Sequence, residues 1–256
     1  MSARILLLDI ERLPAWTKPL PIWDMKGLRY KYLTPADIDT WSRTFCHAYK
    51  WLGERTVSWM AEWEEGGRRG FLERTSELLQ EADLIVGHNM RDFDLPHLTG
   101  ELILENLPVP ALPKVLDTLR TMQKHGNLEN NQLDTLDKRF GFRGKTDKYR
   151  IDMATAAANG DVKQQQRIIR YAQGDIRATE RVYLRLRPVG NINLGLFADD
   201  PTRPVCPKCE STKVQRRGYA TKNALRYPRY QCQSCGGWAT GRSAVKEAGS
   251  VELRPL

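Results

Sequence analysis

Two acidic residues follow an apolar run close to the N-terminus. Residues 5–8 are Ile-Leu-Leu-Leu, and Asp9 and Glu11 come next with one residue between them. Residues i and i+2 of a strand share a face and lie about 7 Å apart, so both carboxylates can converge on one point beyond the strand end. Close carboxylates stay ionised beside a cation, and hard divalent ions prefer oxygen ligands. The pattern indicates a Mg²⁺ or Mn²⁺ site, although a strand that runs out into solvent would also carry it.

Two further segments offer acids at suitable positions. Asp94 follows an apolar run at residues 84–86 and precedes a leucine and a proline, which suits a helix N-cap and is compatible with metal binding. Asp92 competes with it for either role. Tyr171 and Asp175 lie four residues apart in a helical pattern, so they share one face.

Taken in order, three stretches resemble the exonuclease motifs of the DEDD superfamily, the DnaQ-like 3′–5′ exonucleases with a ribonuclease-H-like fold: Asp9-Ile-Glu11, Asn89-x3-Phe93-Asp94 and Tyr171-x3-Asp175. The tyrosine indicates the DEDDy branch, because the DEDDh branch has a histidine where this chain has Arg170. The resemblance spans residues 4–187. Segments 46–53, 117–119 and 131–141 are similar to members encoded by bacteriophages.

The resemblance implies hydrolysis of a phosphodiester bond with two Mg²⁺ or Mn²⁺ ions. Asp9 would bridge both ions, Glu11 and Asp175 would complete one site, and Asp94 would hold the second ion. Tyr171 would orient the attacking water, because a phenol with a pKa near 10 is a poor base at neutral pH.

The elements that must position these residues form a mixed α/β sheet flanked by helices. We expect strands at residues 4–10, 45–51, 56–60, 83–87 and 114–116. We expect helices at 71–80, at 94–106, from about 117, from about 131, and at 162–186. Residues 12–40 are expected to be irregular, and no role is assigned to them.

Four of the five cysteines lie near the C-terminus as two Cys-x2-Cys pairs: Cys206, Cys209, Cys232 and Cys235. This spacing is typical of a structural Zn²⁺ site, and the segment resembles the zinc ribbons of nucleic-acid enzymes. Two disulfides fit a reducing compartment poorly. We therefore predict a ribonuclease-H-like domain at residues 1–188, a linker at 189–204, a zinc ribbon at 205–245 and a tail at 246–256. Cys46 is expected in the core.

The positive charge of the chain is concentrated in the same C-terminal segment. Residues 201–256 contain 11 Lys and Arg against 3 Asp and Glu, which accounts for +8 of the net charge of +9. A concentrated basic segment favours a polyanion such as nucleic acid. Protein docking and plain stability remain the alternatives. The candidate contacts lie among tyrosines, between the two cysteine pairs: Arg216, Arg217, Lys222, Arg226 and Arg229.

Several other residues have two interpretations each. Lys145 either contacts a phosphate or lies in a surface loop. Asp117 either supports the site or caps a helix, and His88 is expected to make a structural hydrogen bond. Six of the seven tryptophans lie in the first quarter of the chain and either pack internally or stack on bases: Trp16, Trp23, Trp41, Trp51, Trp59 and Trp63.

These observations favour a 3′–5′ exonuclease that acts on nucleic acid, with DNA favoured over RNA and single strands over duplexes. A ribonuclease or structure-selective endonuclease of the same fold is an alternative, as is a binding scaffold without catalysis. No apolar stretch reaches the roughly 18 residues of a membrane span, and the N-terminus lacks a signal-peptide pattern. We expect a cytoplasmic protein, in a bacterial host if a phage encodes it.

Overall fold

A computed structural model describes residues 2–17, 21–22, 34–126, 128–198, 200, 203–222 and 225–245. The chain divides into two compact units, Arg4–Tyr183 and Met1–Ala3 with Leu184–Leu256. The predicted tail 246–256, Trp23 and much of segment 12–40 lie outside the described residues. None of the described helices is long and apolar enough to cross a membrane.

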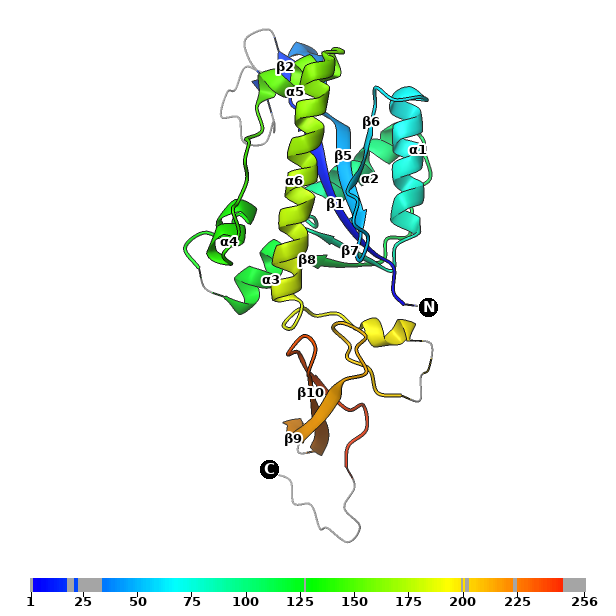
Figure 1. The fold of residues 1–256 in the computed structure, drawn as a ribbon. Coiled ribbons are helices and arrows are strands. Elements are labelled where there is room, and N and C mark those ends of the chain that lie inside the picture. The colour runs from blue at the N-terminus through cyan, green and yellow to red at the C-terminus, as the bar shows by residue number, and fades with distance from the viewer. Residues whose placement is uncertain are drawn as a thin grey trace. The chain divides into compact units, whose positions relative to one another are not determined.

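The larger unit is built on a five-stranded sheet with the strand order β6-β5-β1-β7-β8. The strands are β1 (Ile5–Leu13), β5 (Arg43–Trp51), β6 (Ser58–Ala61), β7 (Leu84–Gly87) and β8 (Lys114–Asp117). Strand β1 pairs antiparallel with β5 and parallel with β7, so the sheet is mixed. Helices flank this sheet (Figure 1), which confirms the predicted fold class.

The alternation of side chains along β1 decides what each face of the sheet contacts. Leu6, Leu8 and Ile10 pack into a core cluster with apolar residues of α1 (Gly67–Gln80) and α2 (Asp94–Leu104). Leu13 belongs to a second cluster, which contains residues of α5 (Ile151–Ala158) and α6 (Val162–Leu186). Asp9 and Glu11 share the odd-numbered face with Leu13. They therefore point towards the side of α5 and α6.

Several elements differ from those predicted. Helix α5 was not predicted, whereas α6 has the predicted bounds. The stretch 12–40 was predicted to be irregular, which is wrong for its described part. Strand β1 continues to Leu13, and β2 (Ala15–Thr17), β3 (Pro21–Ile22) and β4 (Ile38–Thr40) form a small sheet in the order β3-β2-β4, beside a 3₁₀ turn at Pro35–Asp37. Pro21 is tolerated because it is the first residue of an edge strand.

The remaining helices of the larger unit are α3 (Thr118–His125) and α4 (Leu133–Arg139). The smaller unit contains a 3₁₀ turn at Leu194–Phe197 and an antiparallel sheet in the order β11-β10-β9. Its strands are β9 (Val214–Lys222), β10 (Leu225–Cys232) and β11 (Trp238–Thr240). Among the described residues from 203 onwards, only Cys206, Cys232 and Gly237 are buried. This small sheet therefore has almost no apolar core.

Candidate active site

Asp9 and Glu11 lie inside β1 rather than at its end, which corrects the sequence-based expectation. Strand β7 pairs with β1 only along Ile5–Leu7, through residues 84–86, and then stops at Gly87. On the other side, β5 continues to pair with β1 at both acids. Asp9 and Glu11 are thus accessible because β7 ends before it comes level with them. Strand β5 still holds β1 in place at both acids. This arrangement gives them a rigid backbone.

Asp94 occupies the space that β7 leaves beside β1. Its Oδ1 accepts a hydrogen bond of 3.0 Å from the backbone N–H of Ile10. The expected capping role of Asp94 is wrong, because Phe93 is the N-cap of α2 and Asp94 is the first helical residue. The competing acid, Asp92, is exposed and paired with Arg120. The structure therefore selects Asp94 as the acid that joins β1.

Helix α6 supplies the third part of the site. Carboxylate oxygens of Asp9, Glu11 and Asp175 lie within 4.8 Å of one another. Glu11, Asp94 and Asp175 are each at least nine-tenths buried. An all-oxygen donor set of this kind fits a hard divalent cation such as Mg²⁺ or Mn²⁺.

Burial raises the pKa values of all four carboxylates. Burial raises the pKa values of Asp9 and Glu11 well above their usual range, and the neighbouring carboxylates raise them further. Burial also raises the pKa of Asp94 to about 7, and it raises the pKa of Asp175, where Lys145 opposes the shift. A bound cation would reverse this tendency. The raised pKa values thus indicate that the four carboxylates need nearby positive charge to remain ionised.

Lys145 provides part of that charge. Its Nζ lies 2.6 Å from Oδ2 of Asp175 and donates a 3.0 Å hydrogen bond to the hydroxyl of Tyr171. Asp134 holds the lysine backbone through a 2.7 Å bond to the amide N–H. Gly144, at φ +79°, leaves room for this, since a Cβ there would lie 2.6 Å from the Asp134 carboxylate. Lys145 does lie in a loop, which was one of the two interpretations from sequence, but its side chain is directed to Asp175 and Tyr171.

A cleft of about 1750 Å³ in the larger unit is lined by Asp9, Glu11, Lys145, Tyr171 and Asp175. Its wall includes Arg12, His97 and Tyr149, which sequence reasoning missed. The buried Arg12 lies 3.0 Å from Nε2 of His97 and pairs with Glu101, and its carbonyl accepts a hydrogen bond from Tyr149. An arginine directly after Glu11 was the available signal. Its role depends on His97 and Glu101 of α2, which are far away in the sequence.

The secondary candidates have structural roles. Asp117 caps α3 by accepting from the amides of Leu119 and Arg120, and it also accepts from the amides at positions 89 and 91. His88 lies 2.9 Å from the Thr118 hydroxyl, as expected. Cys46 is buried in the core. Among the tryptophans, Trp63 packs against Phe45 and Trp51 lies under Arg4, whereas Trp41 is exposed.

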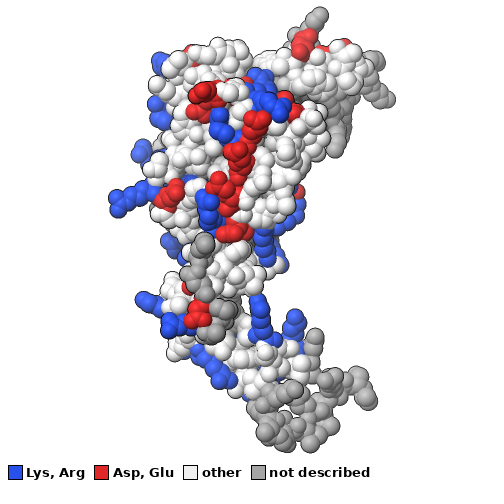
Figure 2. Space-filling model, turned by 90° about the vertical axis from the view of Figure 1, so that its right-hand side faces the viewer, with Lys and Arg blue, Asp and Glu red and all other residues white. Residues whose placement is uncertain are grey.

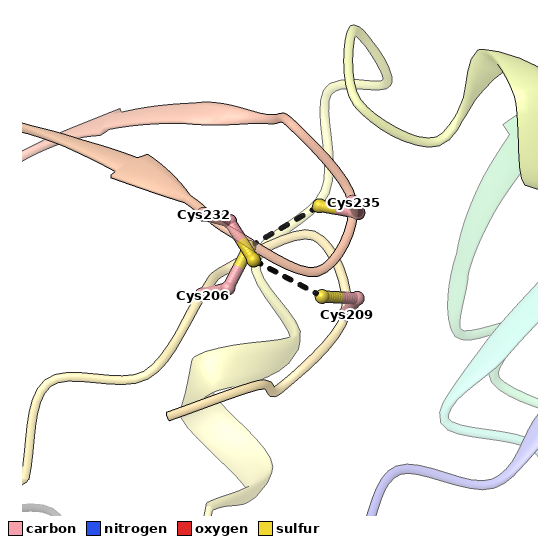
Figure 3. A group of neighbouring side chains, drawn as sticks. All are labelled: Cys206, Cys209, Cys232 and Cys235. Carbon is pink, nitrogen blue, oxygen red and sulfur yellow. Dashed lines mark hydrogen bonds between the residues drawn. The ribbon is translucent and has the colours of Figure 1, made fainter. Parts of the chain in front are cut away.

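The second site is formed by the four C-terminal cysteines. Their sulfur atoms lie within 4.8 Å of one another and point to a common centre (Figure 3). The Sγ–Sγ distances of 3.7 Å for Cys206–Cys235 and 3.6 Å for Cys209–Cys232 are far longer than a disulfide bond. Backbone amides at Lys208, Ser234 and Gly237 donate to three of the sulfurs. Four thiol groups at these distances fit a tetrahedral Zn²⁺ site, in agreement with a zinc ribbon.

The five basic residues predicted to contact nucleic acid lie on β9 and β10, and several of them contact aromatic rings. The guanidinium groups of Arg216 and Arg226 lie 4.9 and 4.2 Å from the ring centre of Tyr219. That of Arg229 lies 4.6 Å from the ring centre of Trp238. Arg217 and Lys222 are exposed on β9. On the face drawn in Figure 2, the charged side chains in the described part of this unit are mostly Lys and Arg, with few Asp or Glu.

The larger unit is similar to known proteins both in its sequence pattern and in its fold. The family model described as the RNase_H superfamily matches residues 43–187, which include Asp94, Tyr171 and Asp175 but not the two acids of β1. No curated protein matches the chain significantly. Among solved structures, the family B DNA polymerase from the hyperthermophilic archaeon Pyrobaculum calidifontis is similar, with a TM-score of 0.53 and 16% sequence identity.

That similarity covers 74% of this chain but only 26% of the polymerase, so it concerns the fold of one part of a much larger protein. The family match spans more than half of the chain and contains β5, β7 and α6, three of the elements that surround the carboxylates. The chain belongs to the RNase H superfamily.

Proposed function

We propose that this protein is a metal-dependent nuclease that removes nucleotides from the 3′ end of single-stranded DNA. The observation that carries the proposal is the meeting of Asp9, Glu11 and Asp175 in one cleft, with Asp94 beside them. Membership of the RNase H superfamily supports a nucleic-acid substrate. The 3′–5′ direction and the DEDDy type rest on the resemblance of the three motifs, in which Tyr171 takes the diagnostic position.

Each acid has a separate task in this proposal. Asp9, Glu11 and Asp175 hold divalent cations through their carboxylates, and Asp94 fixes the backbone of β1 and offers a further oxygen. When bound, two Mg²⁺ or Mn²⁺ ions would neutralise the phosphate and lower the pKa of the attacking water. Without cations the four acids would repel a phosphodiester. The protein itself therefore contributes a rigid, buried donor set.

Tyr171 and Lys145 act on the substrate side of the acids. Burial raises the pKa of Tyr171 further above its usual value, so its hydroxyl stays neutral and orients water by hydrogen bonding. Lys145 donates to that hydroxyl and fixes its direction. Its ammonium also places positive charge where a phosphate would lie.

The zinc ribbon serves as a second contact with nucleic acid in this proposal. One Zn²⁺ on Cys206, Cys209, Cys232 and Cys235 would stabilise a sheet that has little core of its own. The arginines of that sheet suit phosphate contacts, and Tyr219 and Trp238 offer rings on which bases can stack. The double variant Arg226→Gln/Arg229→Gln should weaken oligonucleotide binding and reduce its salt dependence.

The test uses single-stranded DNA and RNA oligonucleotides labelled at the 3′ or the 5′ end, with Mg²⁺ or Mn²⁺. The matched variant is Asp9→Asn, which removes the charge with little change of shape. We expect stepwise shortening of 5′-labelled DNA, and a loss of at least about 1000-fold in rate for the variant. Shortening that survives in Asp9→Asn would refute this site. Internal cutting would favour an endonuclease, and binding without any hydrolysis would favour a scaffold.

A further inference from the structure

A second cavity adjoins the catalytic cleft in the larger unit. It has a volume of about 610 Å³ and lies between the segment 142–147 and one face of α6. Lys145, Tyr171 and Asp175 line both cavities, so these side chains form a shared wall. Anything bound in the second cavity would therefore lie next to the metal-binding acids.

The lining of this cavity is strongly basic. It contains one lysine and five arginines against two acids, Asp147 and Asp175. Three of the cations are neutralised: Lys145 pairs with Asp175, Arg167 with Asp147, and Arg181 with Asp137. The other three cations form no ion pair with any residue that the structure describes: Arg143, Arg170 and Arg177. Three guanidinium groups around one cavity without counter-charges suit the binding of an anion.

The spacing along α6 brings these groups onto one face. The lining residues of the helix include positions 167, 170, 174, 177 and 181, which repeat at intervals of three and four. Gly174 lies in the middle of this row, and a Cβ built there would meet nothing within 4 Å. A glycine within a helix is unfavourable, and no packing neighbour explains this one. Its missing side chain leaves the floor of the cavity open between Arg170 and Arg177.

We propose that this arginine pocket binds a phosphate group of nucleic acid next to the catalytic site. The proposal rests on the proposed nuclease function for the identity of the anion. Arginine binds phosphate through two parallel N–H···O bonds, and a cavity of this volume accepts a nucleotide. The phosphate belongs either to the substrate strand close to the scissile bond or to the nucleotide that hydrolysis releases.

The test compares three variants of the full-length protein. Arg170→Gln/Arg177→Gln removes two unpaired charges, and Gly174→Leu fills the floor without a change of charge. Lys163→Gln/Arg185→Gln removes two charges from the same helix outside the pocket lining. Binding of a fluorescent 12-nucleotide DNA is measured by anisotropy with Ca²⁺ in place of Mg²⁺, over a range of salt concentrations. Inhibition of DNA hydrolysis by a nucleoside 5′-monophosphate is measured separately.

If the pocket holds a phosphate of the strand, both pocket variants should weaken 12-mer binding, about tenfold for each arginine that no longer reaches the phosphate. The slope of log affinity against log salt should fall by about 0.7 for each phosphate that the variant fails to neutralise. If the pocket holds the released nucleotide, 12-mer binding should change little while inhibition by the monophosphate weakens. Binding and inhibition equal to those of the Lys163→Gln/Arg185→Gln control would overturn the proposal.

The two proposals fail differently. Binding is measured without hydrolysis, so a protein that binds the 12-mer through Arg170 and Arg177 but cuts nothing retains the pocket and loses the nuclease. A protein that cuts DNA with both pocket variants at the rate, affinity and inhibition of the control retains the nuclease and loses the pocket.

Discussion

The Nζ atom of Lys145 lies 2.6 Å from Oδ2 of Asp175 and links a segment near residue 145 to the middle of α6. The same atom donates to the hydroxyl of Tyr171. The lysine thus lies between two residues of one helix turn and compensates part of the negative charge that Asp9 and Glu11 add nearby. The ion pair between Lys145 and Asp175 should therefore stabilise the protein when no metal ion is bound.

Replacement of this lysine by methionine should destabilise the metal-free protein. Lys145→Met keeps the length of the side chain but leaves the buried Asp175 without its cation, so the free energy of unfolding should fall by about 1–3 kcal/mol. Millimolar Mn²⁺ should remove most of the difference. Thermal unfolding with and without Mn²⁺ measures both effects, and Lys148→Met serves as a control. An equal loss with and without metal would show that Lys145 only packs.

The metal-free protein should lose stability as the pH rises. Burial raises the pKa of Asp94 to about 7 in the folded state, above its ordinary value of 3.8. Between these values the folded state binds more protons than the unfolded state, so the free energy of unfolding falls as the pH increases towards and through 7. For Asp94 alone the loss between pH 3.8 and 7 is on the order of 4 kcal/mol, and about half of it falls above pH 5.5, since each tenfold change in proton affinity corresponds to about 1.4 kcal/mol.

Melting curves at pH 5.5 and pH 8 in the presence of a chelator of divalent cations test this expectation. Asp94→Asn should flatten the pH dependence, because the amide oxygen still accepts from Ile10 while the charge is gone. Asp92→Asn is the matched control, since Asp92 is exposed and Arg120 lowers its pKa. A metal-free protein that is more stable at pH 8 than at pH 5.5 would contradict the predicted sign.

The hydroxyl of Tyr171 should matter for rate and not for metal binding. Tyr171→Phe preserves the ring that packs 6.4 Å from Tyr149 and beneath Lys145, and removes only the hydrogen-bonding oxygen. We expect the rate constant of hydrolysis to fall about 10- to 100-fold. The shape of the pH profile should not change, because burial keeps this phenol protonated. If the rate of the variant no longer rose with pH where that of the wild type does, Tyr171 would instead be identified as a base.

Removal of zinc should affect the smaller unit selectively. The described ribbon buries little besides two of its cysteines, so a chelator or Cys232→Ser should expose the amides of β9 and β10 to rapid hydrogen exchange. The amides of β1 and β5 should stay protected, as the larger unit has its own core. Cys46→Ser is the control for loss of a thiol. One zinc atom per chain is expected by metal analysis.

The order of the elements, and which acids and cysteines come together in the structure, could largely be predicted from the sequence. Apolar runs at β1 and β7, and the long amphipathic pattern of α6, are local signals that survive in the fold. The spacing of Tyr171 and Asp175 needs only helical geometry. The cysteine pairs are equally local, because four thiols at these intervals have few other uses in a reducing compartment.

What the sequence did not reveal depends on contacts between distant segments. The position of Lys145 requires the bond from Asp134 to its backbone and the open space at Gly144. The role of Asp94 requires β7 to end before β1 does. Helix α5 was missed because its alanine-rich pattern has little periodicity, and it is held by packing on the sheet.

Helix α6 sets a limit on how the length of this chain can vary in evolution. One uninterrupted helix of 25 residues carries several core residues, the two site residues of the third motif and four arginines of the second cavity. An insertion or deletion of one residue within it would turn everything beyond by about 100°. Side chains of α6 outside the core, the third motif and the second cavity can therefore be exchanged at little cost, whereas a change of length is tolerated only in the segments before and after the helix.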